Sequence, residues 1–295
     1  MTKTPRFSII TACKGRLEHL KQSLPAMLAQ TDSEVIVVDF SCPEEAASYV
    51  EAHFAKARTI RVEGEERFSN WRARNAGASA AKGNYLVFCD ADIVLAKGAT
   101  GTLAKLIGPN SFGYFKNDLS RKVGEEGLAG NQIKGFQVIP RSAFEKRGGY
   151  DEFLTGYAAG GDTELEERLR FLQLRPVPLD LEIVERVIAH DDEARMRFHD
   201  QPPALSYLVG YLYRWTKVAL MGIRKGIELE PEAKARLHEA AQEGALRFLG
   251  QNKPGSIKLN AIEEPLNMLR RADGKVPRLR VTINVEVVED PGAKP

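Results

Sequence analysis

The segment YLVFCDADIVL, Tyr85–Leu95, decides the fold, because an apolar run ends in two aspartates, Asp90 and Asp92, before apolar residues resume. Carboxylates beside a buried strand are costly unless something pairs with them. In an extended chain, residues i and i+2 project to the same face, about 6.5–7 Å apart along the strand. We therefore expect both carboxylates to face one site at the end of a strand. The alternative is a solvated turn that follows the strand.

The chemistry of this aspartate pair favours a cation site. Ligands of open parallel sheets gather at the carboxyl ends of the strands. Two carboxylates there repel each other unless a cation or hydrogen-bond donors lie between them. Mg²⁺ and Mn²⁺ suit one or two carboxylates together with substrate phosphate oxygens. A site for Mn²⁺ or Mg²⁺ and a phosphorylated substrate is therefore chemically reasonable, but DxD as a bare pattern still favours the solvated turn.

Apolar strands alternate with helices in the first half of the chain. Strands are predicted at 7–12, 34–40, 58–62 and 85–90, and helices at 16–30, 41–54 and 69–83. Ser41 and Glu44 have the spacing of a capping box at the start of the second helix. Continuous apolar strands that alternate with helices predict an α/β fold, with a parallel sheet covered on both faces.

The pattern is more mixed in the second half. Strands are predicted at 112–118, 135–141 and 182–190, and helices at 142–149 and 162–174. The stretch HDQPPALS, 199–206, indicates a boundary near residue 200. Beyond it, helices are predicted at 207–223 and 231–250, followed by a strand that is apolar on one side, at 279–290.

Composition excludes several classes of protein. The chain has 295 residues, of which 43% are apolar and 28% charged, with a net charge of +2. So small a charge gives no basis for binding nucleic acid or an anionic membrane. Three cysteines without a CxxC motif, Cys13, Cys42 and Cys89, indicate reduced and mostly buried thiols. The first apolar stretch is too short for a signal peptide or a membrane span, so we expect a cytoplasmic location.

The segment FSNWRARNAGASAAKGNYLVFCDADIVL, 68–95, resembles the family 2 glycosyltransferases and, in its spacing, the β-1,4-galactosyltransferases. In such proteins an aromatic residue, a basic residue and an Arg/Lys-x-Asn-x-Gly helix precede an apolar strand that ends in DxD. The matching residues here are Phe68, Arg72, Arg74, Asn75, Gly77, Gly83 and Asp90–Asp92. Three further segments match in order, at 8–44, 135–169 and 186–197, so the resemblance covers about residues 6–200.

The resemblance implies a GT-A fold, which is Rossmann-like and binds a nucleoside-diphosphate sugar. Residues 1–200 would form this domain, with a nucleotide-binding half at about 1–95 and an acceptor half at about 96–200. Residues 201–295 would be a helical extension that ends in a β-strand segment. The implied activity is metal-dependent transfer of a sugar to a hydroxyl acceptor with inversion, and UDP is the commonest donor nucleotide of the family.

The resemblance also implies roles on the donor side. Asp92 would ligate the metal, with His190 as a further ligand, although His190 is also compatible with an ordinary histidine at a strand end. Asp90 would contact the ribose or a metal-bound water, with Ala91 beside it. The further donor contacts would be the loop that begins at Thr11, Asp39 at the end of the second strand, and Arg74 and Asn75 on the helix before DxD.

On the acceptor side, the family places its catalytic base at Asp162. An aspartate at the start of a helix is also a favoured N-cap, and Glu164 is a second candidate for the base. Tyr150, Asp151 and Glu152 would line the acceptor site. The chain departs from the family at Gly161 and at Phe40, where acidic residues are common. These departures leave open a catalytically inactive module that binds nucleotide sugars.

Two other interpretations remain open at this point. The pattern VFCDADIV also fits the nucleophile strand of haloacid-dehalogenase-like phosphohydrolases, in which Asp90 would attack phosphorus. The mixture of aromatic and basic residues in 201–250 is compatible with a peripheral contact to the inner face of a membrane, or with a core or homodimer contact. The expected partners are a nucleotide-sugar donor and a glycan, glycolipid or small hydroxyl acceptor, and no nucleic acid.

Overall fold

The computed structural model describes residues 6–116, 122–123, 128–129, 133–157, 159–189, 196–250, 257–265, 271–276 and 278–285. The chain divides into two compact units. The sheet unit comprises Met1–Glu152 and Gly161–Asp200, and the helical unit comprises Phe153–Gly160 and Gln201–Pro295.

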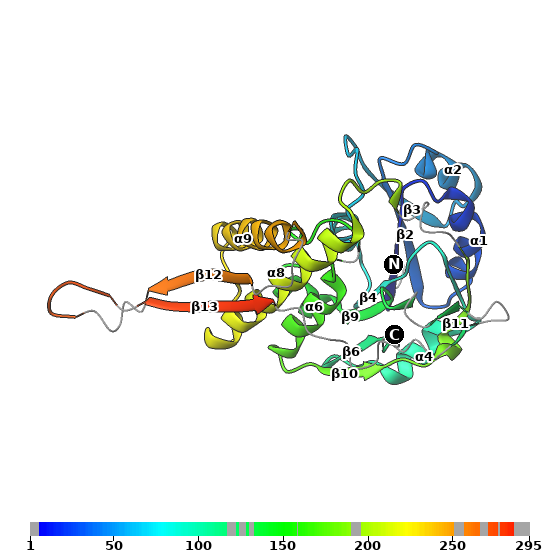
Figure 1. The fold of residues 1–295 in the computed structure, drawn as a ribbon. Helices are drawn as coiled ribbons and strands as arrows, with labels where there is room; N and C mark the ends of the chain where they lie inside the picture. The colour runs from blue at the N-terminus through cyan, green and yellow to red at the C-terminus, as the bar shows by residue number, and fades with distance from the viewer. Residues whose placement is uncertain are drawn as a thin grey trace, which may run out of the picture. The chain divides into compact units, whose positions relative to one another are not determined.

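A seven-stranded sheet in the order β10-β6-β9-β4-β1-β2-β3 forms the centre of the sheet unit (Figure 1). Its strands are β1 (Phe7–Cys13), β2 (Ser33–Phe40), β3 (Ala57–Val62), β4 (Tyr85–Phe88), β6 (Ser111–Tyr114), β9 (Gln137–Pro140) and β10 (Arg175–Pro178). The pairings β4–β1, β1–β2 and β2–β3 are parallel, whereas β9 is antiparallel to both β4 and β6. The carboxyl ends of β1 to β4 therefore meet at one edge.

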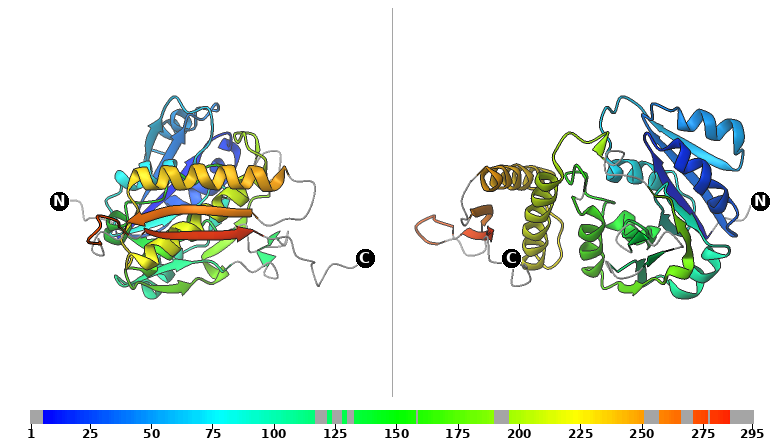
Figure 2. Two further views of the ribbon diagram at one scale, coloured as in Figure 1. Left: turned by 60° about the vertical axis from the view of Figure 1, so that its left-hand side comes forward. Right: turned by 45° about the vertical axis from the view of Figure 1, so that its right-hand side comes forward.

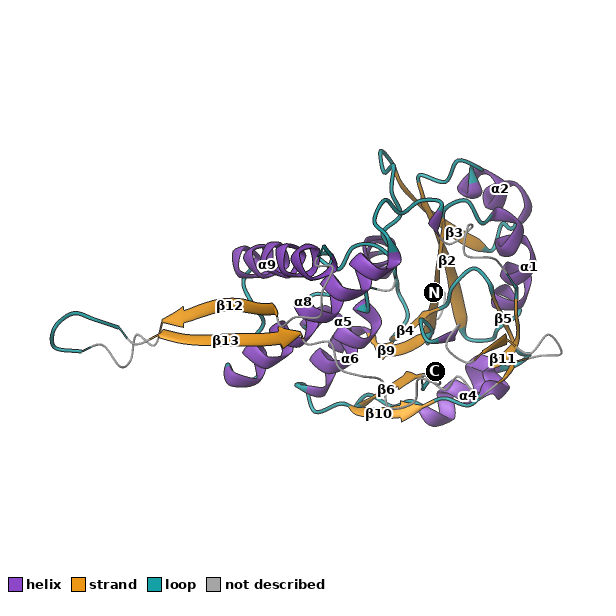
Figure 3. Cartoon of the chain, in the orientation of Figure 1, coloured by secondary structure: helices purple, strands orange, loops and turns teal. Residues whose placement is uncertain are grey.

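Short strands and helices complete the unit, as Figure 3 shows. They are α1 (Leu17–Leu28), α2 (Ala46–His53), α3 (Asn70–Ser79), β5 (Ile93–Leu95), α4 (Ala99–Leu106), β7 (Lys122–Val123), β8 (Leu128–Ala129), α5 (Arg141–Lys146), α6 (Gly161–Arg170), η2 (Leu181–Ile183) and β11 (Val184–Val187). Two apolar cores line the two faces of the sheet. Residues of α1, α2 and α4 belong to one core, and residues of α3, α5 and α6 belong to the other. The predicted α/β fold with both faces covered is confirmed.

The capping box predicted at Ser41 and Glu44 is wrong. Helix α2 begins only at Ala46, and the Ser41 hydroxyl donates to the carbonyl of Val62 instead. The Glu44 carboxylate accepts the backbone N–H of Leu17 at 2.8 Å, so it serves the first turn of α1. Ser41 and Glu44 have the spacing of the motif, but their side chains bind to β3 and α1 and do not cap α2.

The helical unit contains α8 (Pro203–Ile223), α9 (Pro231–Leu249), β12 (Ile257–Pro265) and β13 (Arg278–Val285). Strands β12 and β13 pair antiparallel, and β12 lies beside α9 (Figure 2). The buried Lys217 of α8 forms an ion pair of 2.9 Å with Glu228. No described helix is both long enough and apolar enough to cross a membrane.

The aromatic residues of α8 divide between two environments. Tyr213 is buried in the unit, whereas Tyr207, Tyr211 and Trp215 are exposed and follow one another along one side of the helix. Arg214 lies 5.2 Å from the ring centroid of Tyr211. Only part of the aromatic residues of α8 is thus buried in the core of the helical unit. A membrane or homodimer contact through 201–250 stays a prediction.

Helix α3 packs so close to the sheet that Gly77 has no room for a side chain. A Cβ atom at this position would lie 2.5 Å from Cγ2 of Ile10 and 3.0 Å from Cγ2 of Val38. In contrast, a Cβ atom at Gly101 of α4 would have no neighbouring atom within 4 Å. Close approach of α3 to β1 and β2 therefore depends on one glycine.

We predict opposite effects of alanine at these two helical glycines. Gly77→Ala should lower the free energy of unfolding by about 1–3 kcal/mol, because it overpacks the contact with β1. Gly101→Ala should raise it by about 0.8–1.0 kcal/mol, because alanine favours the helix and meets no neighbour. Chemical denaturation of both variants measures the difference. An equal effect at the two positions would contradict the close packing.

Candidate functional site

The two aspartates of the DxD motif lie in a turn between β4 and β5. The carbonyl of Asp90 accepts the N–H of Ile93 at 3.1 Å, and Ala91 and Asp92 are the turn residues. The expectation of an extended chain is wrong here, because β5 leaves the main sheet and pairs antiparallel with β11. The chain has to turn between these two pairings. The carboxylates are therefore set by a turn and not by strand alternation.

Each aspartate is paired with an arginine, and the two arginines belong to opposite layers of the unit. Nη2 of Arg74, in α3, lies 2.6 Å from Oδ1 of Asp90. Nη1 of Arg16, directly before α1, lies 3.3 Å from Oδ2 of Asp92. The side chain of Asp90 remains 34% exposed, whereas that of Asp92 is 9% exposed. The repulsion between the carboxylates is thus offset from both sides of the sheet edge.

The guanidinium of Arg74 is enclosed and does not present itself to a ligand. Arg74 is 1% exposed, and its Nη1 donates to the carbonyl of Gly135 at 2.8 Å and to the hydroxyl of Tyr150 at 3.2 Å. Its Cζ lies 5.6 Å from the ring centroids of Trp71, Phe88 and Tyr150. In this structure Arg74 therefore orients Asp90, and the nucleotide contact expected for Arg74 stays a prediction.

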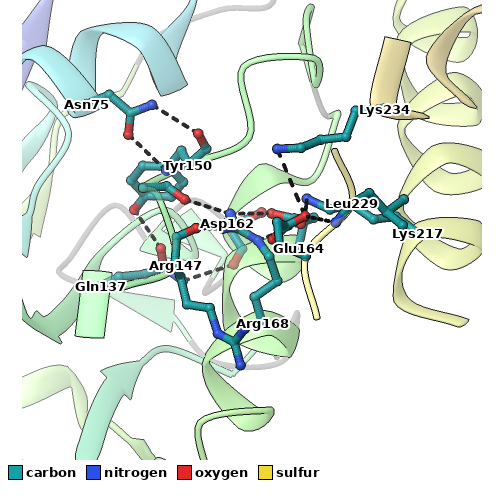
Figure 4. A network of polar contacts seen from close by, with 12 residues as sticks. Asn75, Gln137, Arg147, Tyr150, Asp162, Glu164, Arg168, Lys217, Leu229 and Lys234 are labelled. Atoms are coloured by element: carbon teal, nitrogen blue, oxygen red, sulfur yellow. Dashed lines mark hydrogen bonds and ion pairs between the residues drawn. The ribbon is translucent and has the colours of Figure 1, made fainter. Parts of the chain in front are cut away.

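A chain of hydrogen bonds runs from this ion pair to α6. Figure 4 shows the part of it that involves Tyr150, Gln137 and Asp162. The Tyr150 hydroxyl donates to Oε1 of Gln137 at 2.7 Å. Nε2 of Gln137 donates to the carbonyl of Asp162 at 3.1 Å and to Oε1 of Glu166 at 3.0 Å. The antiparallel register of β4 and β9 pairs Phe88 with Gln137 and so brings the amide to the end of β4. The two sides of the candidate site are thus directly connected.

Sequence reasoning missed Gln137. The signal was present, because it is a polar residue within the apolar strand GFQVIPR. Gln137 is completely buried. A buried amide must find hydrogen-bond partners, and all the partners of this one belong to the candidate site.

Asn75 holds the segment that was expected to line the acceptor site. Its Nδ2 donates to the carbonyl of Tyr150 at 3.0 Å and to the Glu152 carboxylate at 2.8 Å, while its Oδ1 accepts the N–H of Tyr150 at 2.8 Å. The amide of Asn75 is thus used within the protein. Tyr150 and Asp151 are buried, and only Glu152 of the three predicted acceptor residues is exposed.

Helix α6 carries the two candidate bases in very different settings. Asp162 lies in its first turn and is 8% exposed. Glu164 is fully buried, and its two carboxylate oxygens accept Nε and Nη2 of Arg168, each at 2.7 Å. Arg168 also donates to the carbonyls of Arg147 and Gly149. Glu164 therefore anchors the helix, and Asp162 is the candidate base that remains.

The absence of an acidic side chain at position 161 is explained by the position of Trp71. A Cβ atom at Gly161 would lie 2.5 Å from Cε2 of the Trp71 indole. The indole thus occupies the space into which the acidic side chain common in the family would project. The second departure, Phe40, is buried and packs edge to face on Phe68 with a centroid distance of 5.8 Å.

Glu166 is a buried carboxyl one helical turn after Asp162. Burial, followed by the negative charge of Asp162, raises the pKa of Glu166 from its ordinary value of 4.5 to about 7. The bond from Gln137 and the charges of Lys134 and Arg170 oppose this rise. Near neutral pH the carboxyl of Glu166 is therefore only partly ionised.

The two residues predicted on the donor side of the first two strands, Asp39 and Thr11, differ in their hydrogen bonds. Oδ1 of Asp39 accepts the N–H of Cys42 at 2.7 Å, and its Oδ2 accepts the N–H of Ala47 at 2.8 Å. Asp39 thus orders the start of α2. The hydroxyl of Thr11 is buried, with no hydrogen-bond partner among the described residues.

Of the residues expected to surround a metal, Asp90 and Asp92 lie in the described part of the chain. His190 lies outside the described residues. Among the described ones, no group of three or more His, Cys, Asp or Glu side chains is placed to hold a metal ion. The donor set of the turn does fit Mn²⁺ or Mg²⁺, because Asp90 and Asp92 supply hard carboxylate oxygens and Asp90 is partly open to a substrate.

Comparisons with known proteins identify the family. Residues 8–147 match the family model for glycosyl transferase family 2. The chain contains a family 2 glycosyltransferase domain. The matched residues include the DxD turn, α3 and the strands β1 to β4. This match decides against the phosphohydrolase interpretation, which also left the Arg74–Asp90 pair without a role.

Solved structures similar to this glycosyltransferase share its fold at low sequence identity. A mannosyltransferase from Pyrobaculum calidifontis in complex with GDP-Man and Mn²⁺ has a TM-score of 0.52 and 17% identity, covering 84% of this chain and 75% of that chain. S. aureus TarS residues 1–349 with UDP-GlcNAc has a TM-score of 0.58 and 15% identity, covering 83% and 73%. No curated protein sequence matches the chain. The expected GT-A fold is confirmed.

Glu166 predicts a pH dependence of stability in the glycosyltransferase. The pKa of Glu166 is raised in the folded state. Its contribution to the free energy of unfolding is therefore fully present below its pKa in the unfolded state and is lost as pH rises through its pKa in the folded state. The loss should occur between about pH 4.5 and 7 and amount to about 3 kcal/mol. Glu166→Gln should abolish this slope, as measured by urea denaturation across the window. Glu167→Gln, at the half-buried neighbouring position, should keep the slope of stability against pH. A wild-type slope in Glu166→Gln would refute the raised pKa of Glu166.

Proposed function

We propose that this chain is a metal-dependent, inverting glycosyltransferase that moves a sugar from a UDP-sugar to a hydroxyl acceptor. One observation carries the proposal. The hydrogen-bonded chain Asp90–Arg74–Tyr150–Gln137–Asp162 connects the DxD turn to the backbone carbonyl of the residue that carries the candidate base. Such a connection fixes the position of a base relative to a donor, which is what transfer between two bound substrates requires.

Similar structures support the donor class. S. aureus TarS residues 1–349 has been solved in complex with UDP and with UDP-GlcNAc, and the Pyrobaculum calidifontis mannosyltransferase with GDP-Man and Mn²⁺. The parallel strands β1, β2 and β4 of this chain end at the edge where nucleotides bind in open α/β sheets. We assign the nucleoside to the loop at Thr11–Gly15 and to Asp39. The loop follows β1 and Asp39 lies near the end of β2, so both belong to that edge of the sheet.

Asp162 is the proposed base. The acceptor oxygen attacks the anomeric carbon of the donor while the bond to the diphosphate oxygen breaks, and Asp162 takes the proton of the acceptor hydroxyl. Asp162 lies in the first turn of α6 and is 8% exposed, so its position is fixed by the helix. We propose that it works by this position relative to the acceptor hydroxyl.

Asp92 would hold the metal, together with His190, and Asp90 would contact the ribose or a metal-bound water. Bound Mn²⁺ or Mg²⁺ would neutralise the charge that develops on the leaving diphosphate. Arg16 offsets the charge of Asp92 in the structure. The acceptor would be a glycan, a glycolipid or a small hydroxyl compound, bound near Glu152 and Gly161. We propose a cytoplasmic location, with 201–250 available for contact with a membrane or a second copy.

Asp162→Asn is expected to lower transfer at least 10³-fold, because the amide cannot accept the acceptor proton, while donor affinity changes less than threefold. Activity is measured as release of the nucleoside diphosphate from a panel of UDP- and GDP-sugars, with and without acceptors. Glu167→Gln removes a charge from the same helix and should leave turnover unchanged. Wild-type-like turnover of Asp162→Asn would rule out the base. A wild-type protein that binds donor without any turnover would instead be the inactive binding module.

Metal dependence is tested by nucleotide binding. Mn²⁺ should increase the affinity for UDP at least tenfold, and UDP at a hundred times its Kd should then stabilise the fold by about 2.7 kcal/mol. Asp92→Asn should remove the Mn²⁺ effect. Asp32→Asn, at an exposed position whose positive φ suits asparagine, should retain it. Calorimetric titrations that give the same UDP affinity with and without Mn²⁺ would exclude metal dependence.

A further inference from the structure

Two cysteines outside the proposed catalytic residues lie together at the edge of the sheet. Cys13 is the last residue of β1, and Cys42 follows β2 by two residues. The parallel register pairs Cys13 with Asp39, which brings the two thiols to the same end of neighbouring strands. Their Sγ atoms are 4.0 Å apart and share a hydrogen bond.

The surroundings of the Cys42 sulfur stabilise a thiolate. The N–H of Gly15 donates to it at 3.2 Å. The hydrogen bond from Cys13 lowers the pKa of Cys42 to about 6 against the effect of burial, and backbone N–H groups of Gly15, Glu44 and Ala46 act in the same direction. The same hydrogen bond and burial raise the pKa of Cys13. Cys42 is therefore the more acidic thiol of the pair.

Charged groups from both neighbouring elements face this pair. The carboxylate of Asp39 raises the pKa of Cys13, and the ammonium of Lys14 interacts with Cys42. Cys42 is 8% exposed and Cys13 1% exposed. The thiol nearer to solvent is thus the one whose pKa is lowered, which is the arrangement of an attacking thiol and a resolving thiol.

We propose that Cys42 and Cys13 form an oxidation site for hydrogen peroxide and other small peroxides, which closes a disulfide between β1 and β2. The Cys42 thiolate attacks a peroxide oxygen, so that an S–O bond forms, the O–O bond breaks and hydroxide leaves. Cys13 then loses its proton to hydroxide and attacks the Cys42 sulfur. The S–S bond forms, the S–O bond breaks and a second hydroxide leaves. The two sulfurs lose two electrons in total, and the peroxide gains them.

Closing this bond changes the loop that follows β1. A disulfide requires the sulfurs to approach from 4.0 Å to about 2.05 Å. The thiolate that accepts the N–H of Gly15 is lost. Lys14 follows Cys13 directly, and its Nζ binds the carbonyls of Phe40 and Ser41, the two residues before Cys42. The proposed function places the nucleoside at Thr11–Gly15, so on the basis of that function oxidation should weaken UDP binding.

The test uses the whole chain treated with hydrogen peroxide, quenched, and digested without reduction. Mass spectrometry of the wild type should give a crosslinked peptide that contains Cys13 and Cys42 and disappears with dithiothreitol. Cys13→Ser should stop at an oxygenated Cys42, and Cys42→Ser should leave Cys13 unmodified. Cys89→Ser, at a buried thiol outside the pair, should behave as wild type. Absence of the crosslink in the wild type, or equal oxidation of Cys89, would overturn the proposal whatever the folding of the variants.

A second measurement separates this inference from the proposed function. Oxidised wild type should bind UDP with Mn²⁺ at least tenfold more weakly than reduced protein, and dithiothreitol should restore the affinity. Unchanged affinity in a fully crosslinked sample would refute the coupling. If the reduced protein binds no nucleotide, the proposed function fails, while the peptide map still decides the thiol chemistry.

Discussion

The ion pair between Arg74 and Asp90 is the interaction on which the rest of the site depends. A guanidinium that is 1% exposed must recover the hydration it has lost, and it does so with a carboxylate, a carbonyl and a hydroxyl. Each of these partners comes from a different part of the chain. The requirement to satisfy one buried cation therefore brings together α3, the end of β4, the start of β9 and the segment that carries Tyr150.

The consequences extend in both directions from this pair. Towards the donor edge, Asp90 keeps part of its side chain open because only one of its oxygens is bound to Arg74. Towards α6, Tyr150 and Gln137 pass the same constraint to Asp162 and Glu166. The buried pair of Glu164 and Arg168 then fixes the helix itself. The position of the candidate base is thus fixed by contacts among buried groups of the protein.

The sequence predicted the parts of the fold that depend on local pattern. Continuous apolar runs identified the parallel strands, and the DxD context indicated the candidate site. The turn at Asp90–Ile93 was missed, because it results from the pairing of β5 with β11, about ninety residues apart along the chain. The enclosure of Arg74 was missed for a similar reason. Its burial depends on Gly135, Tyr150 and Phe88 meeting around it, and no local pattern contains that information.

The contact between Trp71 and Gly161 makes these two positions a single unit of evolutionary change. An acidic side chain cannot enter at 161 while the indole stays, and removal of the indole alone would leave a void beside Tyr150, whose ring centroid lies 5.0 Å away. We therefore expect relatives that carry the acidic residue to have a smaller or differently oriented residue at the position of Trp71. A comparison of many such chains should show the two columns covarying, and a designer who wishes to alter acceptor preference has to exchange both residues in one step.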